Sequence, residues 1–321
     1  VITGMFDRRG RYMAANNLRQ AQVPAGATVI PQTRGTAPGL ICPVEVAGVA
    51  KVLYAVPGVP HEMKEMVQRA ILPDLLRRGG QPGAIISRTL RTWGESESGL
   101  NERLDPLIAT LDELGNPTLA FLASGWEGLK IRLTAKAAST IEAAVLLDQW
   151  ENEVRAVVGD IVFGIDDDTM ESVVLDMLRD RGWSLGLAES VTGGLVAGRI
   201  TSVPGASDVF RGSVVSYASE VKFTLLGVPR GPVVSEAAAV AMAVGARRVL
   251  QADVAVSLTG VAGPAEQDDM PVGTLCVAVA TPAGVSARTF TLPGQRDQMR
   301  QMSVITALDY LRRQLVAVKS A

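Results

Sequence analysis

The sequence predicts an α/β protein of several domains, and three observations lead to this prediction. At 321 residues the chain is too long for one ordinary small domain. Short apolar runs typical of strands alternate along it with longer runs at helical spacing. Apolar residues make up 47% of the sequence and charged residues 20%, which is typical of globular domains with ample cores. We expect domains at residues 1–80, 84–164 and 166–321.

Composition narrows the functional classes. The formal net charge of −2 gives no electrostatic reason to expect tight nucleic-acid binding, so a nucleic-acid partner is not predicted. Cys42 and Cys276 form no disulfide framework, which favours a reducing compartment. No apolar run is long enough to predict a membrane-spanning helix, and the N-terminus lacks the layout of a signal peptide. We therefore expect a cytoplasmic protein with no membrane partner.

The first domain should end in a helix that proline interrupts. Residues 1–4 read as the end of a strand, and residues 61–72 as a helix that Pro73 should kink or restart. Glycine and proline in 35–39 and 57–60 indicate either tight turns after strands or backbone cradles for a nucleotide. The candidate nucleotide-binding residues here are Gly35, Thr36, Pro57, Gly58 and the carboxylate Glu62. His61 has no companion ligand nearby, so no metal site is predicted around it.

The middle domain follows a turn-rich linker at residues 78–83. Its predicted elements, in chain order, are a strand at 85–93, a helix at 95–111, strands at 118–122 and 129–135, and a helix at 140–158. This β-α-β-β-α order is typical of a small α+β domain.

The last domain should be an α/β sandwich with helices packed on a mixed sheet. The acidic run 165–171 precedes a helix at 170–181, with Thr169 or Asp168 as its cap; a cation site is the alternative. The elements expected next are a strand at 185–188, a helix at 195–200, a strand at 214–218, helices at 220–227 and 235–250, strands at 254–258, 273–280 and 285–292, and a helix at 297–315.

The corner at residues 189–194 is the candidate active-site turn. A strand there enters a helix, so the free N–H groups of the first helical turn should face the space above the sheet. N–H groups around Thr192, Gly193 and Gly194 could bind an oxyanion beside Ser190. The alternative is that Ser190 or Thr192 merely caps the helix.

A lysine is the candidate base for Ser190. The chain has six lysines against 25 arginines, and beyond residue 136 the lysines are Lys222 and Lys319. Lysine, unlike arginine, can lose its proton near neutral pH, so its retention at 222 indicates a need for a neutral amine, unless it is a chance survival. Since His61 lies in another predicted domain, we predict that Lys222 activates Ser190 with Tyr217 as relay.

Further candidates surround this corner. The loop 259–264 leaves a strand as the corner does, so both should meet at one edge of the sheet, unless the loop is a simple connection. Arg296 or Arg300 could hold a substrate phosphate, or could form surface salt bridges instead.

At these residues the sequence resembles the CinA family of competence/damage-inducible proteins. The matching motifs are Ala188–Gly194, Val203–Ser207, Phe210–Gly212, Val215–Ala218, Lys222, Val234–Glu236, Ser257–Pro264, Pro271–Thr274, Arg296–Asp297 and Arg300. The resemblance implies hydrolysis of the carboxamide of nicotinamide mononucleotide to the acid and ammonia, without a cofactor, by a homodimer. Ser190, Tyr217 and Lys222 match the family's serine, tyrosine and lysine. The substrate-binding residues it implies are Thr192, Gly193, Gly194, Gly212, Thr259, Gly260, Ala262, Gly263, Arg296 and Arg300. The chain departs from the family pattern at Ala265–Asp269, where a glycine-rich segment is usual, so we expect a different shape at the substrate's rim.

The rest of the chain is also similar to this family. Asn16–Gln20, Gly35–Gly39 and Pro57–Met63 resemble the second half of its molybdopterin-binding-like domain, and residues 84–164 resemble its KH-like module, although no Gly-x-x-Gly loop is obvious. The glycine-rich loop and paired aspartates that usually precede these motifs are absent, so we expect either that the chain is truncated or that a stretch is missing between Gly4 and Met5. The alternative functions are a metal-dependent ADP-ribose pyrophosphatase, with a divalent metal and potassium if that site is intact, and a non-catalytic nucleotide-binding scaffold.

Overall fold

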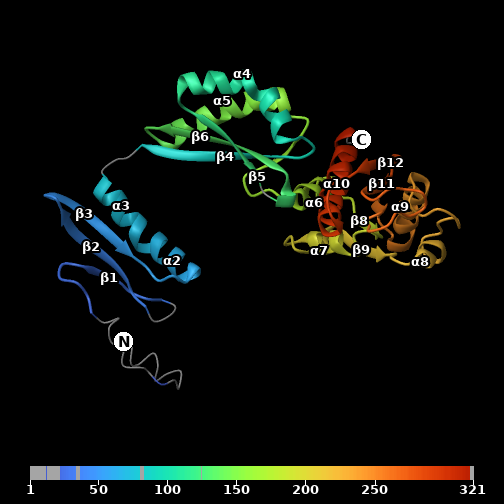
Figure 1. Ribbon diagram of the computed structural model, residues 1–321, viewed down its shortest axis with the longest axis horizontal. Coiled ribbons are helices and arrows are strands. Elements are labelled where there is room, and N and C mark those ends of the chain that lie inside the picture. The colour runs from blue at the N-terminus through green and yellow to red at the C-terminus, as the bar shows by residue number, and fades with distance from the viewer. Residues whose placement is uncertain (1–11, 13–21, 34–36, 80–82, 124, 319–321) are drawn as a thin grey trace. The chain divides into compact units, whose positions relative to one another are not determined.

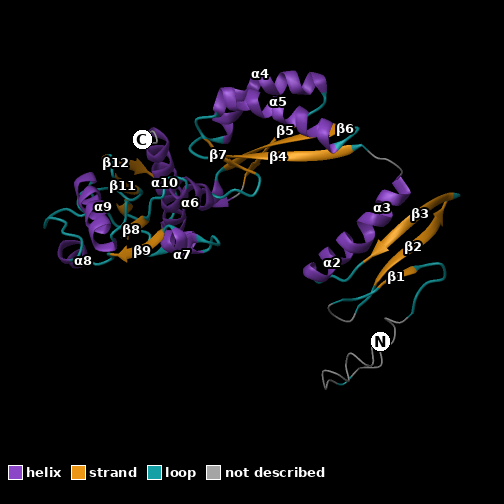
Figure 2. Cartoon of the chain, turned by 180° about the vertical axis from the view of Figure 1, so that it is seen from behind, coloured by secondary structure: helices purple, strands orange, loops and turns teal. Residues whose placement is uncertain are grey.

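The computed structural model describes residues 12, 22–33, 37–79, 83–123 and 125–318 of the chain. It divides into two compact units, residues 1–83 and 84–321, which are treated separately below. Both combine sheets with helices (Figures 1 and 2), so the predicted multi-domain α/β class is confirmed. No helix within the described ranges combines the length and apolarity that crossing a membrane requires.

The first unit is a three-stranded antiparallel sheet with helices on one face. Its elements are β1 (Thr28–Ile30), β2 (Gly39–Val46), β3 (Val49–Ala55), α2 (Pro60–Met66), a π-helical turn (Val67–Ile71) and α3 (Leu72–Gly79). Ile30, Ile41, Met66 and Ile71 form the core between sheet and helices. The expected irregularity at Pro73 is the π-helical turn Val67–Ile71 that precedes it. Proline has no N–H to donate and its ring crowds the preceding turn of the helix, which disfavours a regular α-helix there. The strand predicted at residues 1–4 lies outside the described residues.

The middle part of the second unit is a four-stranded antiparallel sheet of order β5-β6-β4-β7 with two helices. Its elements are β4 (Ala84–Thr92), α4 (Glu97–Leu114), β5 (Thr118–Ala123), a 3-10 turn (Gly125–Glu127), β6 (Leu129–Ala137), α5 (Thr140–Val158) and β7 (Val162–Ile165). Serine hydroxyls at Ser96 and Ser139 cap the two helices. The sequence interpretation missed β7, which is four residues long, contains Gly164 and pairs with β4 across a register shift.

The C-terminal part is a helix–sheet–helix sandwich on a mixed sheet of order β12-β11-β10-β8-β9. Strands β8, β9 and β10 run parallel, and β11 and β12 are antiparallel additions. The elements are α6 (Met170–Arg179), β8 (Leu185–Glu189), α7 (Leu195–Thr201), a 3-10 turn (Ala206–Asp208), β9 (Phe210–Val215), α8 (Ser219–Thr224), α9 (Glu236–Leu250), β10 (Val254–Gly260), β11 (Thr274–Thr281), β12 (Gly284–Thr291) and α10 (Arg296–Ala317).

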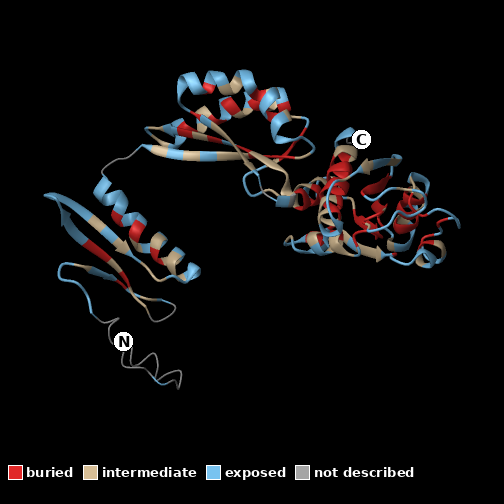
Figure 3. Ribbon diagram, viewed as in Figure 1, coloured by how far each residue is buried: buried red, intermediate tan, exposed pale blue. Residues whose placement is uncertain are grey.

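The two faces of this sheet differ in side-chain size. Large residues such as Leu187 and Val256 pack with residues of α6, α7 and α10 in the main core. Figure 3 colours the buried residues along these elements red. Small residues such as Ala188, Ala255 and Ala278 face α8 and α9. Successive side chains of a strand point to opposite faces of the sheet. Alternation of large and small residues along each strand therefore gives one face a core of large side chains and lets helices pack closely against the other face.

One expectation in this region is corrected and another is confirmed. The strand predicted at 214–218 is Phe210–Val215, so Tyr217 lies in the segment between β9 and α8. The shift arises at Gly212, whose φ of 139° accompanies an irregular register against β8 and hides the strand periodicity. The predicted cap of helix α6 is confirmed, because Thr169 caps the helix and forms a capping box with Ser172. No cluster of three candidate metal ligands occurs in the described part of the chain.

We predict that a methyl group at Gly245 destabilises the α9 side of the sandwich. A Cβ at this position would lie 2.1 Å from the backbone oxygen of Leu226, so Gly245→Ala should lower the free energy of unfolding by about 1–3 kcal/mol. The matched control is Gly198→Ala in α7, where a Cβ meets open space and helix propensity should raise stability by roughly 0.5–1 kcal/mol. Urea denaturation compares the two variants, and equal stability would contradict the packing described.

Candidate active site

The corner between β8 and α7 is built around the carboxylate of Glu189. This side chain is fully buried and accepts five hydrogen bonds. Oε2 accepts from the Thr192 hydroxyl at 2.8 Å and from the N–H groups of Gly194 and Val196 at 3.0 Å, while Oε1 accepts from Ala197 N–H and the Ser213 hydroxyl. The carboxylate thus satisfies the first turn of α7, where negative charge is favoured.

This cap corrects two expectations about the corner. Neither Ser190 nor Thr192 caps α7, because its N-cap residue is Gly194 and the carboxylate of Glu189 takes that role. The N–H groups of Gly193 and Gly194 are not available to an oxyanion, since they donate to Ser190 O and to Glu189. Gly193 and Gly194 have φ values of 62° and 96°, which favour glycine and allow the chain to fold back over the carboxylate. The described structure assigns no acceptor to the N–H groups of Val191 and Thr192.

Ser190 lines a cavity of about 180 Å³ at the carboxyl edge of the parallel strands. Its own N–H is fixed by Leu258 O of β10 at 3.0 Å. The lining residues are Ser190, Val191, Tyr217, Ser219, Lys222, Val233, Val234, Thr259, Gly260, Val261, Ala262, Gly263, Ala265, Gln267 and Arg296. The volume is below the roughly 300–1,000 Å³ of sites that enclose a whole small molecule, so it suits the reacting end of a larger ligand.

Lys222 points its amine into this region from α8. The residue is 1% exposed, and Nζ donates to Ser216 O at 2.7 Å. Burial lowers the pKa of Lys222 from its ordinary value, and the negative charge of Asp268 opposes this shift. A lysine amine buried in this way loses its proton at a lower pH than the amine of an exposed lysine does.

Tyr217 and Arg296 stand together at the rim of the cavity. Tyr217 is 61% exposed, and its phenol oxygen accepts a hydrogen bond from Arg296 Nη2 at 2.8 Å. Arg296 Nη1 donates to Gly263 O, also at 2.8 Å. No hydrogen bond joins Tyr217 to Ser190 or Lys222 in the described part, so the relay role stays a prediction. The guanidinium of Arg296 has no carboxylate partner there and is oriented by two neutral oxygens.

The remaining predicted residues separate into two groups. Thr259, Gly260, Ala262 and Gly263 line the cavity. Five predicted substrate-binding residues do not line it: Thr192, Gly193, Gly194, Gly212 and Arg300. Thr192 turns its hydroxyl to Glu189, and Arg300 Nη2 donates to Thr192 O at 2.8 Å, so both support the corner.

Sequence reasoning missed Glu189 and Asp268. A glutamate at the end of an otherwise apolar strand was the available signal for Glu189, because a carboxylate there must find several donors. Asp268 lies in an acidic loop segment, and no signal in the sequence distinguishes it from its neighbours.

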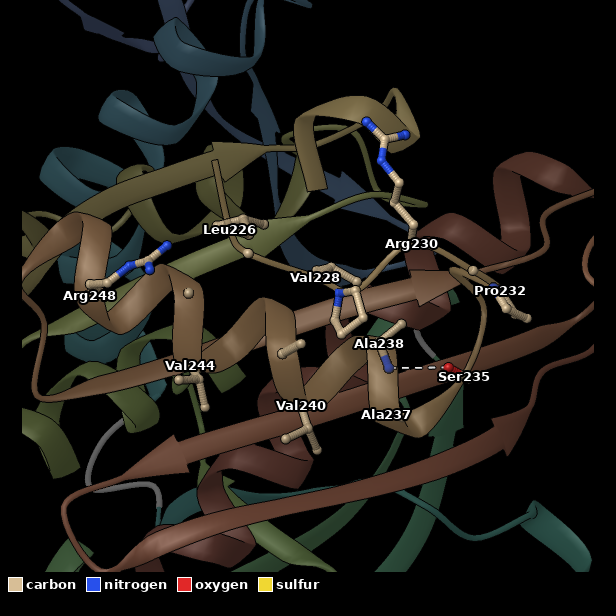
Figure 4. Close-up of a pocket in the computed structure, with 15 residues that line it drawn as sticks. Leu226, Val228, Arg230, Pro232, Ser235, Ala237, Ala238, Val240, Val244 and Arg248 are labelled. Carbon is tan, nitrogen blue, oxygen red and sulfur yellow. Dashed lines mark hydrogen bonds between the residues drawn. The ribbon is translucent and has the colours of Figure 1, made fainter. Parts of the chain in front are cut away.

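A larger cavity of about 610 Å³ lies between α9 and the segment 226–232 (Figure 4). The lining of this cavity is mainly apolar, and Val240 and Val244 contribute to it from α9. Two arginines also line the cavity, Arg230 on the segment 226–232 and Arg248 on α9. None of the predicted catalytic residues lines it. We assign the candidate active site to the smaller cavity, where a hydroxyl, an amine and a guanidinium converge.

The candidate nucleotide site of the first unit is incompletely described. Gly35 and Thr36 lie outside the described residues. Pro57 and Gly58 precede α2, and a Cβ at Gly58 would meet open space. Glu62 Oε2 accepts a hydrogen bond from Gln32 Nε2 at 3.1 Å.

Comparisons of the chain with known proteins point to one family. The model of the CinA C-terminal domain matches residues 167–315, and that of the damage-inducible protein CinA KH domain matches residues 87–164. A CinA-like protein of Frankia casuarinae is 45% identical over 97% of this chain and 72% of its own length. A CinA-like protein of Synechococcus sp. is 44% identical over 96% of this chain and 74% of its own. The crystal structure of a competence/damage inducible protein from Agrobacterium tumefaciens is 32% identical, covering 45% of this chain and 92% of that chain with a TM-score of 0.43. The identity over nearly the whole chain establishes that this protein belongs to the CinA family.

Proposed function

We propose that this chain hydrolyses the carboxamide of nicotinamide mononucleotide to nicotinate mononucleotide and ammonia. The observation that carries the proposal is the convergence of Ser190, Tyr217, Lys222 and Arg296 on one cavity, with the lysine amine buried. A hydroxyl and an amine of lowered pKa that line one cavity can support nucleophilic acyl transfer when no imidazole is present.

In the first step, Ser190 Oγ attacks the carboxamide carbon and its proton passes to neutral Lys222, directly or through Tyr217. The negative oxygen of the tetrahedral intermediate is placed near the N–H group of Val191, which lines the cavity and has no acceptor in the described structure. Collapse breaks the C–N bond, and ammonia leaves with the proton held by Lys222. Water then attacks the Ser190 ester, which releases the acid and restores the hydroxyl.

Arg296 is the residue proposed to bind the substrate phosphate. It stands at the rim of a cavity that suits the pyridine ring, and its guanidinium is already oriented by Tyr217 and Gly263 O. Such preorientation reduces the entropy lost on binding an anion. Arg300 is assigned to the corner instead, because it binds Thr192 O. The scheme uses no cofactor.

The alternative functions have less support from the described residues. Nothing in the described part favours metal-dependent cleavage of ADP-ribose by the first unit, so this activity stays a prediction. The homodimer also stays a prediction. A non-catalytic scaffold would bind nicotinamide mononucleotide at the same cavity without releasing ammonia. Product analysis with and without chelator therefore separates the three functions.

We predict that Ser190→Ala abolishes ammonia release from nicotinamide mononucleotide while the fold is retained. Loss of the nucleophile should reduce kcat by about 10⁴-fold or more. Ser202→Ala, which removes a hydroxyl bonded to Gly198 O at the end of α7, is the matched control and should keep wild-type turnover. Near-normal turnover in Ser190→Ala would rule out this serine as nucleophile.

We also predict that the reaction slows as the pH falls through the pKa of Lys222. Burial lowers that pKa from its ordinary value of 10.5, so the neutral amine persists to lower pH than in an exposed lysine and is lost on protonation. Lys222→Met and Lys222→Arg should each reduce kcat/KM by about 10²–10⁴-fold, since neither side chain can accept the proton. Lys136→Arg on the exposed side of β6 serves as control. An unchanged acid limb in Lys222→Met would contradict the assignment.

A further inference from the structure

A tight turn in the loop after β10 contributes a wall of the same cavity. Gln267 and Met270 exchange backbone hydrogen bonds of 3.2 and 2.9 Å, and Asp268 and Asp269 between them have φ values of 53° and 59°. Two central residues in the left-handed region define a type I′ turn, which ordinarily uses asparagine and glycine. Each aspartate held there costs about 1–3 kcal/mol, so contacts of the turn as a whole must offset this cost.

Asp268 makes contacts of this kind. Its Oδ2 accepts the N–H groups of Val233 at 2.7 Å and Val234 at 2.9 Å. Bonds from two amides to one carboxylate oxygen are charge-assisted and hold both peptides in place. Asp269, its neighbour in the same turn, has no hydrogen bond in the described part of the chain.

The two valines connect this turn to the reacting residues. Both are buried and line the cavity, and Val233 O accepts the Thr259 hydroxyl at 2.7 Å. Thr259 follows Leu258, whose carbonyl holds the N–H of Ser190. A continuous series of hydrogen bonds and peptide units therefore runs from Asp268 through the valine wall to Ser190.

The carboxylate also acts on Lys222. Its charge opposes the effect of burial on the lysine amine. The other ionisable groups that line the cavity are Tyr217 and Arg296, which bind each other. Glu220 lies on the same helix as Lys222, and its carboxylate is paired with Arg230 at 2.8 Å.

We propose that Asp268 is a positioning residue of the active site, which fixes the Val233–Val234 wall through its carboxylate and places a negative charge in the loop that lines the cavity of Lys222. The inference deepens the proposed deamidation and rests on it for its kinetic consequences. The structural part, that Asp268 holds the valine wall, stands apart from any reaction. The proposal assigns a role to the segment 265–269, where the sequence departs from the family pattern and a different shape of the substrate-binding rim was expected.

Three variants test the proposal: Asp268→Ala, Asp268→Asn and the control Asp269→Asn. In Asp268→Ala the amides of Val233 and Val234 should exchange with solvent deuterium at least about tenfold faster, because they lose their acceptor. Asp268→Asn keeps an amide oxygen and should restore part of the protection. Asp269→Asn should exchange as the wild type does.

The kinetic readout separates positioning from a purely structural role. Asp268→Ala should lower kcat with nicotinamide mononucleotide by about ten- to a hundredfold, and Asp268→Asn by less. Both remove a charge that raises the pKa of Lys222, so the acid limb of the pH profile should move to lower pH. The pH dependence of Lys222 acetylation, measured by peptide mass spectrometry, should shift in the same direction.

The possible outcomes distinguish this proposal from the proposed function. Wild-type protein that releases no ammonia would refute deamidation, while exchange and acetylation still test Asp268. Wild-type exchange at Val233 and Val234 in Asp268→Ala, or an acetylation profile that does not move in either Asp268 variant, would overturn the positioning role. Equal shifts in Asp269→Asn would also overturn it, because they would reflect the net charge of the loop.

Discussion

The bonding of the Glu189 carboxylate is the interaction on which the active-site region depends. Five donors from the corner, the first turn of α7 and β9 converge on one fully buried side chain. A buried carboxylate without these partners would cost several kcal/mol, so the donors and the acid stabilise each other. Ser190 follows this residue directly, and Ser216 N–H binds Glu189 O, so the same residue positions the serine and the chain that leads to Lys222.

This arrangement also determines how the site can activate its nucleophile. Since Glu189 occupies the positive end of α7, that helix does not provide the anion site that a strand-to-helix corner commonly offers. The activating group must come from another element, and α8 provides the buried amine of Lys222. Arg296 then remains as the cation at the rim, so the charge that binds a phosphate and the amine that accepts a proton lie on different elements.

Periodicity and local chemistry in the sequence were sufficient to predict the α/β class, most elements of the sandwich and some residues of the cavity around Ser190, among them Lys222 and Arg296. The position of Tyr217 was harder, because Gly212 disrupts the alternation that would have located β9. The use of the α7 amides was predicted wrongly, because whether an N–H is free depends on a side chain whose direction the sequence does not reveal. Asp268 acts through backbone contacts with residues 34 and 35 positions away, and no local pattern encodes such a contact.

The most direct test of this account is a comparison of Glu189→Gln with Glu171→Gln. Glu171 is also buried and pairs with Arg199 of α7, but it lies away from the corner. Both variants should lose stability in urea denaturation, by about 1–3 kcal/mol or more for each unsatisfied buried group. The account predicts that Glu189→Gln loses most of its ammonia release from nicotinamide mononucleotide while Glu171→Gln retains it. Wild-type turnover in a folded Glu189→Gln variant would contradict the claim that this carboxylate positions Ser190.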